Sequence, residues 1–325
     1  AQVLNCAPKE VFFTSGGSEA DNQALISAAA IGKKQGKCHI VSTAMEHHAI
    51  LHTLEALQAE GFTVTLLRPQ ADGIVTATQV AEAITDTTCL VSVMYANNET
   101  GAIQPIREIG ALCRKRGIFF HTDAVQAAGH LAIDVQRDNI DMLSLSAHKF
   151  HGPKGIGLLF AKSNIQLTSL IRGGGQERGK RAGTENLPGI IGLAAALKDA
   201  QENMQQNTAY ITGLRDALRN GLDKIDGASF NGSREHCLPG TVNYSFQGVN
   251  GETLLSLLSN EGICCSSGSA CSAGSLEPSH VLLALGLSHE TAQSALRFSL
   301  CEYNTLDEVQ TIITKVTEAV NRLRR

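Results

Sequence analysis

The chain has 325 residues, of which 43% are hydrophobic and 18% are charged, and its formal net charge is −4. At about 150 residues per domain this length predicts two domains, and the composition is typical of a globular protein. The acidic balance excludes an electrostatic footprint for nucleic acid. No apolar window approaches the roughly 18 residues that span a bilayer, so we expect a cytoplasmic protein that acts on small polar molecules.

The first two thirds of the chain alternate short apolar runs with amphipathic stretches, a pattern typical of a mainly parallel sheet covered by helices. Apolar residues at helical spacing predict helices over 19–34, 48–60 and 105–116. The expected fold class is therefore α/β with a seven-stranded sheet, whose strands we predict at residues 11–14, 39–43, 63–67, 89–95, 118–123, 142–146 and 156–161.

The last third of the chain has a different pattern. After about residue 190 there is one long helical segment, then strands near 241–246 and 295–300, and then a terminal helix. This order predicts a smaller α+β domain. No Pro/Gly/Ser linker marks the boundary, which we place inside helical sequence, so the expected domains are 1–205 and 206–325.

Polar residues that follow the predicted strands are the first candidates for a site, because ligands of open α/β sheets lie beyond the carboxyl ends of the strands. The run 14–18, Thr-Ser-Gly-Gly-Ser, follows the first strand and opens a helix. Backbone N–H groups there, with a hydroxyl, favour an anion such as phosphate. A serine helix cap with glycines in the turn explains the run equally well.

Two later strands end in groups that suit one cofactor. Asp123 ends a strand and Gln126 follows it, while Ser146, His148 and Lys149 end the next strand. Helix caps and a solvated surface lysine are the plain alternatives. An amine at a cleft, however, forms Schiff bases with carbonyls, and an ionised carboxylate keeps a pyridinium nitrogen protonated. Together these groups indicate pyridoxal phosphate.

A histidine-rich segment follows the second strand. Glu46, His47 and His48 stand together, and His52 lies one helical turn further. Two imidazoles with no third ligand at standard spacing make zinc a weak hypothesis, and no metal site is predicted. We favour stacking of His47 on a planar ring and regard His48 and His52 as ordinary residues of a helix start.

A thiol and a guanidinium in the last third are further candidates. The nine cysteines form no C-x-x-C pair, which argues against a disulfide framework. Cys271 stands among small polar residues that predict a mobile loop, where a reactive thiol is favoured over a structural one. Arg297 lies on a predicted buried strand and matches a substrate carboxylate. Neither Cys264 nor Cys265 has a role that we can assign.

Taken together, the chain resembles the cysteine desulfurases of the NifS/IscS type, in the class V aminotransferase family with the type I, aspartate aminotransferase-like fold of pyridoxal-phosphate enzymes. The family's opening segment of roughly fifty residues is absent, so we expect weakened cofactor binding. The motifs that carry the resemblance stand in the family's order at residues 13–19, 46–49, 97–101, 121–126, 148–155, 173–184 and 266–271.

The resemblance implies roles around the cofactor. Lys149 would form the Schiff base, Asp123 would face the pyridine nitrogen, Gln126 the ring hydroxyl, and His47 would stack on the ring and handle protons. Gly17 and Ser18 would contact the phosphate together with Ser146, His148 and, from the neighbouring subunit of a homodimer, Thr184.

The resemblance also implies the reaction. Asn98 and Arg297 would hold the carboxylate of L-cysteine, and Cys271 would take its sulfur as a persulfide, leaving L-alanine. An acceptor protein, such as an iron–sulfur scaffold or a thiolation carrier, would receive that sulfur. The alternatives are a selenocysteine lyase or another enzyme of this fold, such as an aminotransferase, and a non-catalytic or truncated sulfur-relay protein.

Overall fold

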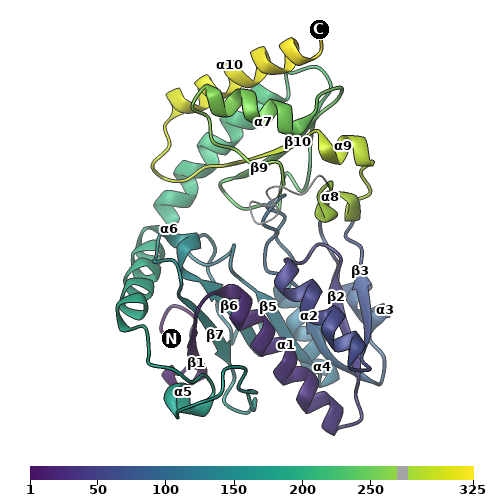
Figure 1. The fold of residues 1–325 in the computed structure, drawn as a ribbon, viewed down its shortest axis with the longest axis vertical. Coiled ribbons are helices and arrows are strands. Elements are labelled where there is room, and N and C mark those ends of the chain that lie inside the picture. The colour runs from purple at the N-terminus through teal and green to yellow at the C-terminus, as the bar shows by residue number, and fades with distance from the viewer. Residues whose placement is uncertain (269–276) are drawn as a thin grey trace. The chain divides into compact units, whose positions relative to one another are not determined.

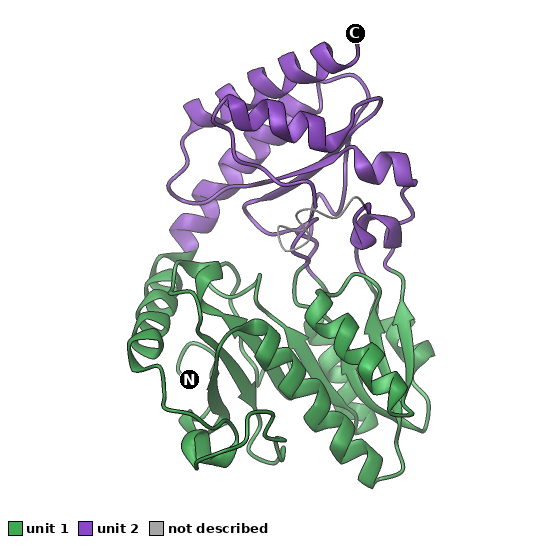
Figure 2. Cartoon of the chain, viewed as in Figure 1, with its two compact units in different colours: residues 1–68, 75–96, 104–204 green, residues 69–74, 97–103, 205–325 purple. Residues whose placement is uncertain are grey.

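The computed structural model describes residues 1–268 and 277–325. The chain divides into two compact units (Figure 2). Unit 1 comprises Ala1–Arg68, Val75–Ala96 and Gln104–Met204, and unit 2 comprises Pro69–Ile74, Asn97–Ile103 and Gln205–Arg325. Two short segments from the first half of the sequence therefore belong to unit 2, whereas the sequence pattern predicted a single boundary.

Unit 1 contains a seven-stranded sheet with the strand order β1-β7-β6-β5-β4-β2-β3 (Figure 1). All pairings from β3 through β2, β4 and β5 to β6 are parallel, and β7 pairs antiparallel with both β6 and β1. The predicted mainly parallel sheet is confirmed. Its strands are β1 Val11–Thr14, β2 His39–Thr43, β3 Thr63–Leu67, β4 Thr88–Ser92, β5 Phe119–Asp123, β6 Met142–Ser146 and β7 Gly157–Ala161.

The helices of unit 1 follow the predicted alternation with the strands. β4 ends at Ser92, three residues before the predicted end, because the chain soon leaves unit 1 for the segment Asn97–Ile103. The helices are η1 Pro8–Glu10, α1 Gly17–Lys34, α2 His48–Ala59, α3 Ala77–Ala83, α4 Ile106–Arg116, η2 Ala147–Phe150, α5 Gln176–Gly179 and the first part of α6 Leu187–Leu222.

Helix α1 lies unusually close to the sheet because its buried face is built from small residues. Ala20, Ala24 and Ala28 are fully buried at intervals of four, and Gly32 continues the row. Residues four apart share one helix face. The row packs on β4, β6 and β7, and a Cβ added to Gly32 would lie 2.5 Å from the Cβ of Cys89. This packing fixes the helix N-terminus at the sheet edge.

Unit 2 has an antiparallel three-stranded sheet, ordered β10-β9-β8, with a core of its own. Leu218 of α6, Tyr244 of β9 and Leu254 of α7 are fully buried in it. The elements are the rest of α6, β8 Ala228–Phe230, β9 Thr241–Phe246, α7 Gly251–Asn260, α8 His280–Ala284, α9 His289–Gln293, β10 Ala295–Ser299 and α10 Leu306–Leu323. None of the helices in the described ranges is both long and apolar enough to span a membrane.

Two helical glycines give a matched test of the α1 packing. Gly32→Ala must displace Cys89, so we expect it to destabilise unit 1 by about 1–3 kcal/mol. Gly213→Ala in α6 meets no atom within 4 Å, and the higher helix propensity of alanine should stabilise it by up to about 1 kcal/mol. Urea-unfolding midpoints of the two variants should move in opposite directions; equal shifts would contradict the close approach.

Candidate active site

The carboxyl ends of three strands meet at one edge of the unit 1 sheet. β5 and β6 are parallel, and β1 runs the same way as β6 because both are antiparallel to β7. Thr14, Asp123 and Ser146 end these strands. Polar groups that follow them are therefore neighbours, which is where open α/β sheets bind ligands.

A small cradle lies at this edge between α1 and β6. A Cβ added to Gly17 would lie 2.8 Å from Val125 Cγ2 and 3.6 Å from Ser146 Cβ. Ser146 Oγ is 2.9 Å from His148 Nδ1. Gly16, the N-cap of α1, makes no side-chain capping bond. Gly17, Ser146 and His148, for which phosphate contacts are predicted, thus lie together at a helix N-terminus, an arrangement that favours an anion.

Asp123 is a buried carboxylate whose charge is supported by Lys149. Its side chain accepts a hydrogen bond of 2.9 Å from the Val125 N–H. Burial raises its pKa to about 6, while that hydrogen bond and the positive charge of Lys149 act in the opposite direction. Lys149 itself lies exposed in η2. At neutral pH the positive charge of Lys149, which follows β6, thus favours the ionised form of Asp123 at the end of the neighbouring strand β5.

His47 is fixed as the N-cap of α2. Its Nδ1 accepts a hydrogen bond of 3.1 Å from the Ala49 N–H. A neutral ring in this position therefore carries its proton on Nε2. Ser18, exposed in the first turn of α1, lines the same surface cavity as His47. The cap uses Nδ1 and is therefore compatible with the predicted stacking of the ring.

Two further buried acids surround Asp123, and the sequence reasoning gave neither a role. Burial raises the pKa of Glu46 to about 8, and the nearby charge of Asp123 adds to this. Burial and Asp123 also raise the pKa of Asp21. Thr43 Oγ1 and the Met94 N–H donate to Glu46 Oε1 at 2.7 and 3.0 Å. Burial thus disfavours the charge on both acids, and Glu46 is protonated at neutral pH.

A buried histidine completes the group. His121 lies on the same face of β5 as Asp123, since the two are two residues apart in a strand. Its Nδ1 is 2.9 Å from Ser92 Oγ and its Nε2 is 3.0 Å from Ser144 Oγ. Burial lowers its pKa to about 3. The ring is therefore neutral at neutral pH, and its approach of 3.7 Å to Asp21 Oδ1 is not an ion pair.

Gln126 and Thr184 make no hydrogen bond to the other predicted site residues within the described ranges. Gln126 is half-buried in the loop after β5, and Thr184 is exposed in the loop before α6. Among residues 1–268 and 277–325, no hydrogen bond links either side chain to the other predicted residues. Their roles stay predictions.

The histidine pair on α2 is a stack. The rings of His48 and His52 are 5.1 Å apart between centroids and inclined by 21°. In the described ranges, no group of three or more His, Cys, Asp or Glu side chains is arranged to hold a metal ion.

Unit 2 contains the predicted substrate residues. Arg297 Nη1 donates to the Asn98 carbonyl oxygen at 2.7 Å, although 199 positions separate them in sequence. Arg297 also pairs with Ser266 in an isolated antiparallel bridge. Asn98 and Arg297 therefore lie together. Cys271 lies outside the described residues.

The comparisons with known proteins define the class to which this fold and site belong. Residues 1–312 match the aminotransferase class-V family. A solved structure titled NIFS-like protein superposes with a TM-score of 0.92 at 38% identity, covering 99% of this chain and 85% of that one. The chain thus has the α/β fold of type I pyridoxal-phosphate transferases, as predicted.

Individual relatives define a narrower family within this class. The chain is 50% identical to cysteine desulfurase IscS of Clostridium botulinum (strain Hall) over 327 residues, covering 100% of this chain and 82% of the relative. It is 46% identical to cysteine desulfurase IscS of Methanosarcina thermophila over 324 residues, covering 100% and 80%. The chain belongs to the cysteine desulfurase family, as its motifs predicted.

Glu46→Gln tests the protonation of the buried acids. The folded pKa of Glu46, about 8, lies above its ordinary 4.5, so folding takes up a proton and wild-type stability falls as pH rises between these values. The slope approaches about 1.4 kcal/mol per pH unit. The amide keeps the acceptor oxygen and has no proton to lose. The stability of the variant relative to wild type should therefore increase from pH 5 to pH 8.

Urea unfolding of the cofactor-free chain at both pH values measures this difference, with Glu60→Gln, an exposed residue that follows α2, as the control. A Glu46→Gln effect that is the same at pH 5 and pH 8 would show that Glu46 is ionised in the folded chain.

Proposed function

We propose that this chain is an enzyme that removes sulfur from L-cysteine and passes it to Cys271. The observation that carries the proposal is the pairing of buried Asp123 with Lys149 beside the Gly17–Ser146–His148 cradle, in a chain of the cysteine desulfurase family. A related structure, 40% identical with a TM-score of 0.80, is titled SspA in complex with cysteine. That title supports L-cysteine as the substrate.

Pyridoxal phosphate fits the residues at this edge. The close approach of Gly17 to Val125 and Ser146, the start of α1 and the Ser146 hydroxyl suit its phosphate, and Asp123 suits a protonated ring nitrogen. Lys149 would hold the cofactor through its amine, Gln126 would contact the ring hydroxyl, and Ser18, His148 and Thr184 would add phosphate contacts. When bound, the cofactor supplies an electron sink for bonds at the substrate α-carbon.

The side chains of the chain then have distinct tasks. Asp123 places its negative charge against the ring, and burial disfavours the charge on its neighbours Asp21 and Glu46. Lys149 Nζ moves the proton at the substrate α-carbon, and His47 covers the ring and exchanges protons at Nε2. Arg297 and Asn98 bind the substrate carboxylate, a task for which a guanidinium has the matching geometry.

The sulfur transfer is balanced without an external oxidant. The carbon–sulfur bond of L-cysteine breaks, a sulfur–sulfur bond forms with Cys271, and a proton takes the place of sulfur on the carbon. The products are L-alanine and a Cys271 persulfide. The sulfur becomes more oxidised as the carbon is reduced.

We further propose a cytoplasmic homodimer that delivers the persulfide to an acceptor protein, such as an iron–sulfur scaffold or a thiolation carrier. The names of the IscS relatives support this setting. Thr184 is exposed, and Leu187 and Ile191 at the start of α6 are each 61% exposed one helical turn apart. Exposed apolar residues beside Thr184 support a subunit contact there.

Cys271→Ala separates substrate binding from sulfur transfer. We expect the variant to bind pyridoxal phosphate and to change its visible spectrum with L-cysteine, but to form neither persulfide nor alanine, because the acceptor thiol is lost. Cys264→Ala, at an exposed thiol in the same region, should keep wild-type turnover. Alanine release by the first variant would assign the sulfur to another acceptor.

Gly17→Ala tests the phosphate cradle. The new Cβ would lie 2.8 Å from Val125 Cγ2 and narrow the space at the helix start, so affinity for pyridoxal phosphate should fall at least about tenfold, or about 1.4 kcal/mol. Gly16→Ala is the matched control, since its nearest atom, Ser146 Oγ, would be 3.8 Å away. Absorbance titration of both cofactor-free variants measures the difference; equal affinities would place the phosphate elsewhere.

A further inference from the structure

The turn Asn97–Thr100 is rigid because its own side chains lock it. Asn97 Oδ1 accepts hydrogen bonds from the N–H groups of Glu99 and Thr100, both at 2.9 Å, and from Thr100 Oγ1 at 3.2 Å. Asn243 Nδ2 donates to the Glu99 carbonyl oxygen at 3.2 Å. Glu99 is 1% exposed. Its carboxylate therefore projects from a fixed point.

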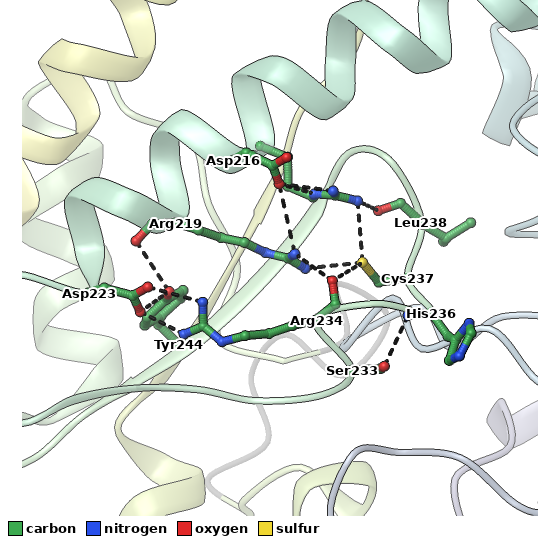
Figure 3. Close-up of polar contacts among 10 residues, drawn as sticks. Asp216, Arg219, Asp223, Ser233, Arg234, His236, Cys237, Leu238 and Tyr244 are labelled. Atoms are coloured by element: carbon green, nitrogen blue, oxygen red, sulfur yellow. Dashed lines mark hydrogen bonds and ion pairs between the residues drawn. The ribbon is translucent and has the colours of Figure 1, made fainter.

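The segment that pairs with this turn is itself in contact with two arginines of α6. The chain after the turn pairs with His236–Leu238, through the Ile103 N–H on the His236 carbonyl and the Leu238 N–H on the Gly101 carbonyl, both at 2.9 Å. Arg219 Nη2 of α6 lies 3.2 Å from Cys237 Sγ (Figure 3). Arg215 Nη1, also of α6, lies 3.3 Å from the same sulfur. The turn is thus tied to the core of unit 2.

The carboxylate of Glu99 lies against described residues on both sides of 269–276. It contacts Ser279 on the C-terminal side and adjoins Gly268 on the N-terminal side. Ser279 Oγ donates to Glu99 Oε2 at 2.5 Å and also caps α8 through the Leu282 N–H at 3.3 Å. A Cβ added to Gly268 would lie 3.5 Å from the same Oε2. One buried oxygen therefore lies against both Gly268 and Ser279.

The turn Asn97–Thr100 also holds Ser266, through Arg297. Ser266 and Arg297 exchange backbone hydrogen bonds of 3.0 and 2.7 Å, and Arg297 donates to the Asn98 carbonyl. Ser266 Oγ also donates to the Gly268 carbonyl at 3.0 Å. Asn98 thus holds Ser266 through Arg297, in addition to the contacts that Glu99 makes with Ser279 and Gly268.

We propose that Glu99 is a positioning residue that fixes Gly268 and Ser279, the two ends from which the Cys271 segment extends, and so sets the rate of sulfur transfer. The anchoring stands on the contacts within unit 2, and its effect on rate rests on the proposed function. Fixed positions on both sides of a thiol-bearing segment raise the effective concentration of the thiol at a bound substrate.

The test compares Glu99→Ala and Ser279→Ala with Ser288→Ala in the full-length, cofactor-loaded chain. Ser288 caps the equally short helix α9, so its variant loses a cap without affecting Glu99. We expect hydrogen exchange of peptides covering 264–268 and 279–283 to accelerate about tenfold in the first two variants only. Single-turnover persulfide formation should fall about tenfold or more, with the affinity for L-cysteine unchanged.

The double variant should be no slower than the slower single variant, because both changes break one contact. Unchanged exchange at both ends would overturn the anchoring. Faster exchange with wild-type persulfide formation would overturn the effect on rate, as would a parallel loss of L-cysteine affinity, which would place the action of Glu99 on Asn98 and Arg297. If the wild type itself forms no persulfide, the proposed function fails, and the exchange comparison still decides whether Glu99 anchors the two ends.

Discussion

A single buried charge organises the site in unit 1. Asp123 ends β5 inside the protein, where an isolated carboxylate is costly, and it stays ionised because the Val125 N–H and the Lys149 amine favour the charge. Parallel pairing of β5 with β6 places that amine near the carboxylate. The charges of Asp21 and Glu46 would oppose that of Asp123, and burial raises the pKa of both groups. The edge of the sheet thus offers one negative and one positive group to a cofactor.

In unit 2, one turn contacts residues that are far apart in sequence. In the turn Asn97–Thr100, the Asn98 carbonyl oxygen accepts a hydrogen bond from Arg297, and the Glu99 carboxylate accepts one from Ser279. Arg297, Ser279 and Gly268 therefore share one support. A support of this kind explains why a short motif in the first half of the chain belongs to the C-terminal unit.

The sequence was sufficient where a residue's role follows from its place at a strand end. Buried strands read as apolar runs, so Asp123, Ser146 and Lys149 could be found by looking just after them. β8 was missed because three half-exposed residues give no periodicity. Asp21 could not be grouped with Asp123, since its proximity depends on how α1 packs on the sheet. The alternation of His121 and Asp123 along one strand was the available signal.

The central claim is that Lys149 is the amine that holds the cofactor. Borohydride reduction of the chain loaded with pyridoxal phosphate, followed by peptide mass spectrometry, identifies the lysine that carries the reduced pyridoxyl group. The account predicts a modification confined to Lys149 and lost in the Lys149→Ala variant. Modification of another lysine, such as Lys154, with Lys149 unmodified would contradict it.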